Sequence, residues 1–491
     1  MLISLQNPIP KCFKGLDLEQ SKVRCLVKVM TGGRINVSKP WPEAVLQRLL
    51  HWAEVDRAVA YGILANGWSL ISGPVTLFLI ATHFSTTVQG YYYTFGNVLA
   101  LQVFVELGLA NVIIQFASHE WSKLDLDGKR RIIGEPEALS RLVSLGRIAF
   151  LWYLVAGGIV AAGVGLGGYI FFSQSAYPGI DWVAPWFILC ILSGINLWLV
   201  PAWSLLEGCN QVSNVYAFRM IRGILGGLSI WTAILLGAGL WTAPASAAVG
   251  IAWSGLFIAW RYRQFFRTFF SQMVGPCIKW RFEVWPMQWK IALSWLSGYF
   301  IFSLFTPVLF YYHGAAVAGQ MGMTWVLLSA LGGVSSLWVL TKAPRFGMFI
   351  AKKEYAELDR VFFRAVTVST GVLLCGGIAL WFVVYFLYVF NHPFSIRLLP
   401  PLPTGLFLLG QIAMITSGFF AVYLRAHKRE PFLGLSIVNG VLMGLFTWLL
   451  GSRFAATGMA IGYLADCVFF VLPYGIVIWY RCRTAWHSDA L

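Results

Sequence analysis

The chain has 491 residues, of which 58% are hydrophobic and 11% are charged. About a quarter of the residues in a soluble protein are charged, so this composition excludes a soluble globular domain. The formal net charge of +16 does not indicate nucleic acid, because the basic residues lie in short loops between apolar runs, where they set topology and meet anionic lipid headgroups. The 8 cysteines form no C-x-x-C pair or Cys/His cluster, so we expect no metal and no cofactor.

Residues 1–58 are predicted to form a cytoplasmic tail. They are rich in Lys and Arg and contain no apolar run of the about 20 residues that a membrane crossing needs. Positions 41–59 read as an amphipathic helix whose apolar face would lie on the membrane surface. The tail lacks the apolar centre and the cleavage site of a signal peptide.

Twelve apolar runs follow the tail, and each is long enough to cross a bilayer. They predict an all-α polytopic membrane protein of about 12 transmembrane helices, arranged in two pseudo-symmetric six-helix bundles. The expected divisions are a first bundle at 59–260, a cytoplasmic linker at 261–287, a second bundle at 288–480 and a cytoplasmic tail at 481–491. The approximate spans are 60–83, 95–116, 147–172, 182–206, 214–237, 240–260, 288–311, 316–341, 362–390, 399–424, 432–450 and 455–480.

The basic residues fix the expected orientation. Of the 36 Lys and Arg residues, only Arg397 and Arg453 fall in loops on the predicted outer side, which leaves 36 minus 2, or 34, on the other. Cytoplasmic loops carry the excess of Lys and Arg in membrane proteins. A multi-pass protein of the cytoplasmic (inner) membrane with both termini inside is therefore predicted.

A weak internal repeat relates the two halves. Val88-Gln-Gly90 and the helix after it occupy the same place in the first half as Val317-Ala-Gly319 and its helix in the second, and a basic loop follows each helix. Both halves have the same orientation, and such repeats place the substrate site between the halves. Pro74 and Pro307 interrupt the leading helix of each half, either as hinges for alternating access or as the ordinary prolines of membrane helices.

Polar side chains inside the predicted spans are the candidate lining of a hydrophilic lumen. The amides could bind a polar substrate or join helices to one another. A carboxylate at mid-depth is expensive unless it is paired, protonated or hydrated, so Glu106 and Asp466 are candidate coupling-ion sites, with a buried partner for a basic residue as the alternative. Glu207 is predicted to pair with Arg219 or Arg222. The amide candidates are Asn66, Asn97, Gln102, Asn111 and Gln115.

Three segments carry a family resemblance. Gln89-Gly-Tyr-Tyr-Tyr-Thr-Phe95, Glu106-Leu-Gly-Leu109 with Ile114-Gln115, and Leu205-Leu-Glu-Gly-Cys-Asn210 resemble the polysaccharide flippase branch of the multidrug/oligosaccharidyl-lipid/polysaccharide (MOP) exporter superfamily. The resemblance covers residues 60–480. It implies a V-shaped pair of six-helix bundles that alternate access and carry a lipid-linked oligosaccharide. Surface polysaccharide (O-antigen) biosynthesis, with a polysaccharide polymerase and glycosyltransferases as partners, is the implied setting.

A polyprenyl-pyrophosphate cargo would need cations for its phosphates, preferably Arg, whose fork matches phosphate geometry. Basic residues at predicted cytoplasmic helix ends are the candidates, and topology or snorkelling is the alternative role of each. They are Arg147, Arg219, Arg222, Lys290 and Lys342.

Two other functions compete with the flippase. A cation-coupled multidrug exporter of the same superfamily would be favoured by an acid within the first helix, where sodium-coupled exporters carry one, but Asn66 lies there. A membrane enzyme of polysaccharide assembly would need catalytic groups on sizeable outer loops, and these loops are short. We therefore expect a transporter and not an enzyme. Gly163-Val-Gly-Leu-Gly-Gly168 matches a dinucleotide motif only formally and predicts close helix packing.

Overall fold

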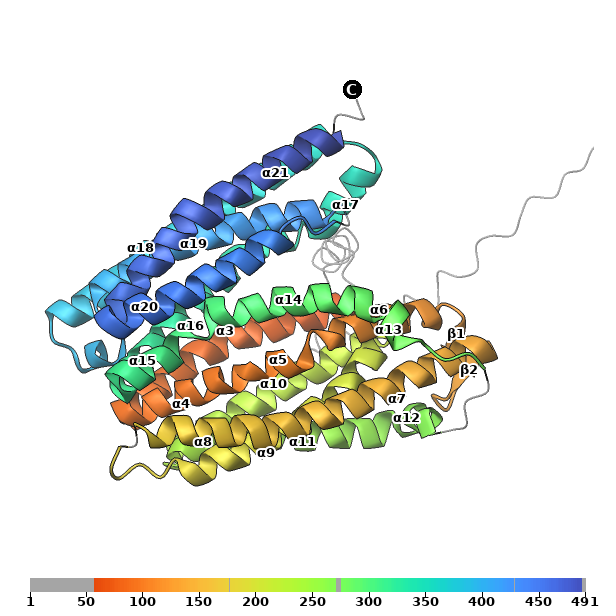
Figure 1. The fold of residues 1–491 in the computed structure, drawn as a ribbon, viewed down its shortest axis with the longest axis horizontal. Helices are drawn as coiled ribbons and strands as arrows, with labels where there is room; N and C mark the ends of the chain where they lie inside the picture. Colours follow the sequence, from red (N-terminus) through yellow and green to blue (C-terminus); the bar gives the residue numbers. More distant parts are fainter. Residues whose placement is uncertain (1–56, 176, 271–274, 428, 488–491) are drawn as a thin grey trace, which may run out of the picture. The chain divides into compact units, whose positions relative to one another are not determined.

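The computed structural model describes residues 57–175, 177–270, 275–427 and 429–487, and Arg57–Leu491 cluster as one compact unit (Figure 1). The expected tail at 1–58, with its amphipathic segment at 41–59, lies outside the described residues except for its last two positions. The described part is almost wholly helical, as predicted. Apolar runs of this length must satisfy their backbone hydrogen bonds internally when they lie in lipid, and the α-helix does so within one segment.

The helices of the first half, which we call the N-bundle, pack on one another, with α3 on α10, α7 on α9, and α10 on α11. The elements in order are α3 (Arg57–His83), α4 (Thr86–Leu99), η1 (Ala100–Gln102), α5 (Val103–Glu106), α6 (Leu109–Trp121), β1 (Leu124–Leu126), β2 (Ile132–Gly134), α7 (Pro136–Ile159), η2 (Val160–Val164), α8 (Gly165–Ser173), α9 (Val183–Gly208), α10 (Val212–Leu235), η3 (Gly239–Trp241) and α11 (Thr242–Arg261). Two short elements follow, α12 (Arg263–Arg267) and η4 (Thr268–Phe270).

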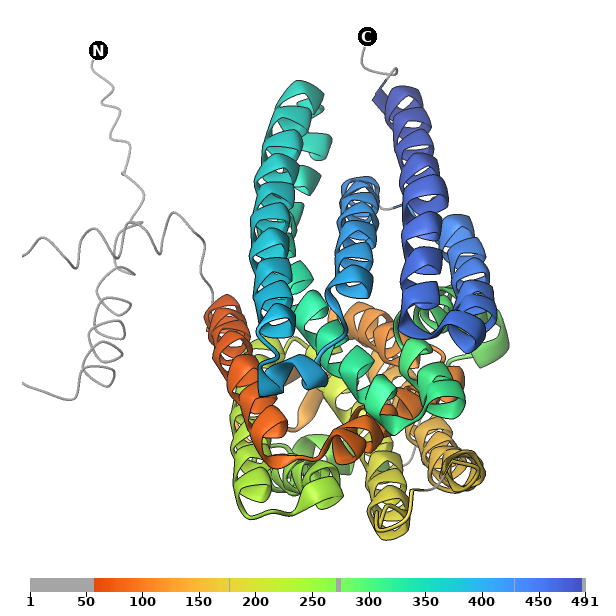
Figure 2. The same ribbon diagram turned by 90° about the vertical axis from the view of Figure 1, so that its left-hand side faces the viewer.

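The helices of the second half, the C-bundle, likewise pack together, with α14 on α20, α16 on α18, and α19 on both α20 and α21. Figure 2 shows α18 to α21, coloured cyan to dark blue, running side by side. The linker helix α13 (Trp280–Glu283) precedes the C-bundle, and the elements of the C-bundle are α14 (Trp285–Phe302), α15 (Phe305–His313), α16 (Ala315–Leu340), α17 (Ala343–Ala351), α18 (Tyr355–Val389), η5 (Pro393–Arg397), α19 (Pro401–Arg425), α20 (Leu433–Asp466), η6 (Cys467–Val471) and α21 (Leu472–His487). The last helix therefore extends into the tail that was predicted to begin at residue 481.

The predicted number of crossings agrees with the helices that the described residues form. Eight helices are long and apolar enough to cross a membrane, and two bent pairs raise the number to 10. One of the eight, Leu433–His487, has 55 residues and folds back on itself after Phe454, so that Gly462 packs against Phe446. Counting this segment twice and adding the 27-residue helix α3 gives the predicted twelve.

Only one of the two interrupting prolines breaks its helix. α14 and α15 meet at a bend of 40° between Phe302 and Phe305. Pro307 explains the bend, because a proline ring clashes with the carbonyl four residues earlier, at Ser303, and cannot donate a hydrogen bond to it. Pro74 lies within the continuous helix α3.

A β-hairpin caps the loop between α6 and α7, a feature that the sequence did not predict. Strands β1 and β2 pair antiparallel, with Asp125 opposite Ile133. The basic residues 129–131 form the turn of this hairpin, where the Asp127 carboxylate accepts hydrogen bonds from the backbone N–H groups of Lys129 and Arg131. The carboxylate thus replaces backbone partners that a tight turn cannot supply.

The end of the linker between the bundles is fastened to the N-bundle. The Arg141 guanidinium on α7 donates to Glu120 at 2.8 Å and to Glu283 of α13 at 2.6 Å. The Ile278 N–H donates to the Ser144 hydroxyl at 3.0 Å. The hydrogen bond from Arg141 holds the pKa of Glu283 below its ordinary value. Through Glu283, the linker is therefore part of the N-bundle up to the start of α14.

Candidate transport site

The second predicted crossing is a broken helix. Leu107 and Gly108 have φ values of 51° and 64°, a left-handed conformation that glycine adopts readily and leucine rarely. The break bends α4–α5 from α6 by 45°. A side chain at Gly108 would also meet Ile291 of α14, because a Cβ there would lie 2.4 Å from its Cγ2. Discontinuous helices of this kind supply binding groups in transporters.

Groups from α7 occupy the break. The Trp152 indole donates to the Val105 carbonyl at 3.1 Å, and the Tyr153 hydroxyl donates to the Glu106 carboxylate at 3.1 Å. Glu106 is half-buried, and the partner that the structure gives it is a phenol rather than a basic residue. Because a phenol does not balance a negative charge, a carboxylate held this way inside a membrane must be hydrated, protonated or bound to a cation.

The amide stripe predicted along this helix is interrupted. Two left-handed residues between Gln102 and Asn111 change the direction of the helix axis, so the amides before and after the break do not share one continuous helix face. Asn97 is half-buried and its amide donates to the Tyr93 carbonyl of its own helix at 3.0 Å. Gln102 and Asn111 are half-buried and Gln115 is exposed. The side chain of Asn66 is outside the described part, and the roles of all five stay predictions.

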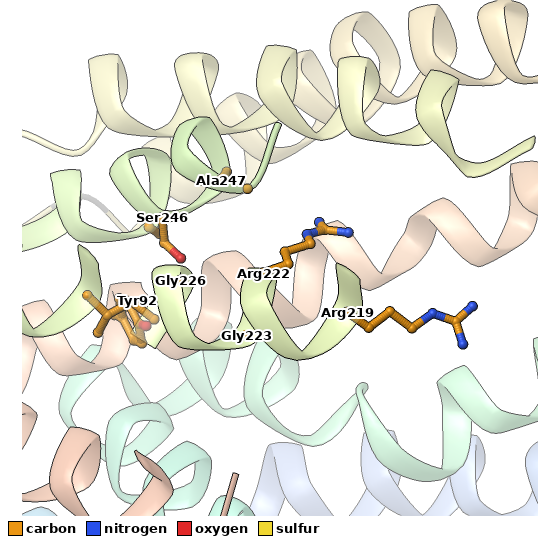
Figure 3. A pocket seen from close by; sticks show the side chains of 10 residues that line it. Tyr92, Arg219, Arg222, Gly223, Gly226, Ser246 and Ala247 are labelled. Atoms are coloured by element: carbon orange, nitrogen blue, oxygen red, sulfur yellow. The ribbon is translucent and has the colours of Figure 1, made fainter. Parts of the chain in front are cut away.

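Two of the predicted phosphate-binding arginines line one cavity in the N-bundle. The cavity has a volume of about 480 Å³ and lies between α10 and α11, with Tyr92 of α4 at one side. Figure 3 shows Arg219 and Arg222 on α10, and Ser246 and Ala247 on α11. The other lining residues are Gly223, Gly226, Ile230, Ala243 and Gly250. Small side chains thus leave room beside two guanidinium groups.

The two arginines differ in their partners. Arg219 is exposed and pairs with Glu207 at 2.6 Å, which confirms the predicted ion pair. Arg222 is half-buried and donates to the Asn196 amide oxygen at 2.8 Å. Asn196 does not neutralise the guanidinium, and burying an uncompensated charge costs several kcal/mol. The cavity around Arg222 is therefore suited to an anionic group.

The two bundles join where α4 and α16 cross. A Cβ at Gly90 would lie 1.9 Å from the Ala315 carbonyl oxygen, and one at Gly319 would lie 2.9 Å from the Gly90 nitrogen. The buried Gln89 amide donates to the carbonyls of Gly319 and Arg397, at 2.9 and 3.1 Å. We call these five residues the outer seal, since Arg397 belongs to a loop predicted to lie outside. The glycines of the predicted repeat thus lie in the largest described contact between the halves.

Apolar side chains also pack between the two bundles at the predicted outer end, next to the outer seal. A cluster of buried side chains joins the final turns of α3, α10 and α18 to α16. At the opposite end, the buried cluster around Phe346, Phe362 and Tyr423 consists of C-bundle residues alone. The main described contacts between the bundles, those of α4 with α15 and α16, therefore lie at the predicted outer end, and α14 makes smaller ones with α5 and α6. The outer cluster consists of Ile80, Ala81, Phe84, Ile234, Met323, Val384 and Leu398.

Asp466 lies in a separate polar site inside the C-bundle. The residue is 2% exposed, and neither carboxylate oxygen has a hydrogen-bond partner among the described residues. The π-helical turn η6 follows it directly, and such turns are common at functional sites. One turn before, the Tyr463 hydroxyl donates to the Gln411 side chain at 2.7 Å. An unpaired carboxylate at this depth needs a proton or cation to balance its charge.

The other predicted cations do not converge on the cavity of Arg222. Arg147 donates to the Phe269 carbonyl at 2.8 Å and borders an apolar groove of about 750 Å³. Lys290 is exposed beside Trp289. Lys342 lines another pocket with Arg345 and Arg364, at the end of the C-bundle.

Sequence reasoning missed Ser246, which lines the cavity, and Asn196, which accepts the hydrogen bond from Arg222. Asn196 could have been found, because it is an amide inside a predicted apolar span, which is the criterion by which the other amide candidates were chosen. Among the described residues no three His, Cys, Asp or Glu side chains gather as a metal site. The glycines of the formal dinucleotide motif lie in η2 and α8, where Gly168 packs against Trp186, as predicted.

Comparisons with known proteins identify the fold. No family model matches the sequence, and no curated relative matches it. The structure is similar to an inward-facing multidrug resistance MATE family transporter of the MOP superfamily, with a TM-score of 0.53 and 13% identity over 84% of this chain and 99% of that one. It is also similar to the MATE multidrug transporter DinF-BH, with a TM-score of 0.53 and 13% identity over 92% of this chain and 99% of that one.

At this identity the likeness shows a common fold. The chain is a predominantly helical, multi-pass membrane protein; its described residues form 8 to 10 apolar spans, with which the twelve-helix, two-bundle layout expected from the sequence is consistent.

Proposed function

We propose that this protein is a transporter that moves an amphipathic organic solute across the membrane by alternating access between its two bundles. The observation that carries the proposal is the distribution of contacts between the bundles. They are concentrated at the outer seal, where Gly90 and Gly319 allow backbones to touch. Alternating access requires a state closed at one end and open at the other, with a rocking motion of one bundle against the other.

The first candidate is an exporter of drug-like solutes coupled to a cation. Both solved structures above are described as multidrug transporters, which favours this cargo over the flippase cargo expected from the sequence. Glu106 and Asp466 are the proposed coupling residues. Each carboxylate lies in a predicted crossing with no basic partner in the contacts described, so binding a proton or cation would change the charge of one bundle.

The second candidate is the flippase for a polyprenyl-pyrophosphate-linked oligosaccharide, acting in surface polysaccharide synthesis. One observation favours it, the cavity that holds Arg219 and Arg222. A guanidinium fork suits phosphate oxygens, and a positively charged drug would be repelled from it. The two candidates thus differ in the charge of the cargo.

Deletion of the gene tests the two candidates against each other. The flippase predicts that lipid-linked oligosaccharide accumulates on the inner leaflet and that surface polysaccharide is lost. The exporter predicts normal surface polysaccharide with increased sensitivity to drugs. Re-expression of the wild-type chain is the control for polar effects on neighbouring genes. Unchanged polysaccharide together with unchanged drug sensitivity would contradict both candidates.

Asp466→Asn is expected to uncouple transport without stopping it. The amide has the shape of the carboxylate but cannot take up a proton or bind a cation by charge, so gradient-driven accumulation of cargo in proteoliposomes should fall about tenfold or more, while downhill exchange continues. Asp181→Asn is the matched control, because Asp181 is exposed. Gradient-driven accumulation at the wild-type rate in Asp466→Asn would remove this residue from the coupling mechanism.

A further inference from the structure

A second basic pocket lies on the C-bundle, away from the cavity of the two arginines. It is formed where α16 ends, α17 begins and α18 passes, and its volume is about 330 Å³. Three cations line it, Lys342, Arg345 and Arg364, together with the apolar side chains of Trp338, Val361 and Val368.

The cations of this pocket are not balanced by carboxylates in the lining. The acidic residues of the neighbouring part of α18 are engaged elsewhere. Glu357 pairs with Arg360 at 2.7 Å, and Asp359 is bound by Arg483 and by the Tyr423 hydroxyl. Arg345 stacks on Phe349, with its guanidinium carbon 5.2 Å from the ring centre. That contact orients the group without neutralising it. Three positive charges therefore share one small hollow.

The apolar side of the pocket matches the position of a membrane interface. Trp338 is 38% exposed and Val368 is 41% exposed. Trp338 precedes Lys342 by one turn at the end of α16, and Val368 follows Arg364 by one turn on α18; both helices are long enough to span a membrane. Tryptophan, lysine and arginine gather where the hydrocarbon core meets the headgroups. In α17, Phe346 is buried whereas Met348 is 56% exposed, as expected of a short helix that lies at that level.

We propose that this pocket binds an anionic phospholipid of the surrounding bilayer. The three cations would hold the headgroup phosphate, and Trp338 and Val368 would contact the first methylene groups of the acyl chains. Basic pockets between membrane helices bind acidic headgroups in this way. A free anion fits less well, because the apolar side chains that form half of the lining cannot bind it. The proposal does not depend on which cargo the protein carries.

Native mass spectrometry of the full-length protein in detergent tests the proposal. The probes are dioleoyl phosphatidylglycerol, dioleoyl phosphatidylcholine and inorganic phosphate. The wild type is expected to retain phosphatidylglycerol in preference to phosphatidylcholine. The triple variant Lys342→Gln/Arg345→Gln/Arg364→Gln is expected to bind phosphatidylglycerol on the order of 100-fold more weakly, since each of the three cations near a membrane surface contributes about a factor of five.

Two further variants keep the result interpretable. The control Lys129→Gln/Lys352→Gln/Lys353→Gln removes three exposed cations outside the pocket and should bind as the wild type does. Lys342→Arg/Arg345→Lys/Arg364→Lys retains the charge and should retain most of the preference, which a mere defect in folding would not permit. Equal losses in the control and the pocket variant would overturn the site. Full displacement of the lipid by millimolar phosphate would show a free-anion site instead.

Discussion

Gly90→Val is expected to prevent closure of the outer seal and to abolish transport. A Cβ at this position would lie 1.9 Å from the Ala315 carbonyl oxygen and 2.9 Å from its Cα, so backbone would have to move. Forcing extra atoms into a packed contact costs about 1–3 kcal/mol or more, which lowers the population closed at this end by on the order of 10- to 100-fold. A transporter that cannot close one end cannot complete its cycle.

The measurement is labelling from outside the cell in a background without cysteines. Met323→Cys reports on the seal, because Met323 is buried in the outer cluster. Its labelling by a membrane-impermeant thiol reagent should be slow in the parent and fast in the Gly90→Val variant. Gly96→Val is the matched control, since Gly96 lies on the same helix with nothing within 4 Å of its Cβ position. Slow labelling and normal transport in Gly90→Val would show that the seal is not a moving contact.

Arg222→Gln is expected to remove the binding of an anionic cargo. A hydrogen bond to a charged group contributes about 1.5–3 kcal/mol, so affinity should fall about 10- to 150-fold. Arg222→Lys should recover only part of it, because an ammonium cannot offer two parallel donors. Thermal stability should hold or rise, since the variant removes a half-buried charge whose described partner, Asn196, is neutral.

Binding and stability are measured on the same purified protein, by titration with a polyprenyl phosphate and by thermal unfolding. Arg267→Gln serves as the control for net charge, because Arg267 is exposed and outside the cavity. A loss of stability with unchanged affinity would assign Arg222 to the architecture of the N-bundle. A gain in the export of positively charged drugs would favour the exporter.

The architecture of this protein is largely readable from its sequence. Long apolar runs allow little besides helices in a bilayer, and the sorting of Lys and Arg limits the topology. The repeat around Gly90 and Gly319 pointed to the seam between the halves, where these two glycines meet. The ion pair of Glu207 and Arg219 was also predictable, because the two residues flank one short turn between helices.

The site was less predictable, because tertiary contacts decide it. The break in the second crossing falls at Leu107, a residue that ordinarily continues a helix, so the sequence did not predict it; α7 supplies the hydrogen bonds at the break through Trp152 and Tyr153. The five cations chosen as phosphate ligands looked alike in sequence, yet only Arg219 and Arg222 share a cavity. The hydrophobicity of a transmembrane helix does not determine which other helices it packs against.

The fastening of the linker by Arg141 limits how the bundles can move. Glu283 is tied to the N-bundle and α14 begins at Trp285, so Val284, which is fully buried, is the one residue between the fastened linker and the first long helix of the C-bundle. A single residue can act as a pivot but cannot slide. We therefore expect the C-bundle to rotate about Val284 during the transport cycle. Inserting residues there should weaken the coupling between the motions of the two bundles before it destabilises the fold of either one.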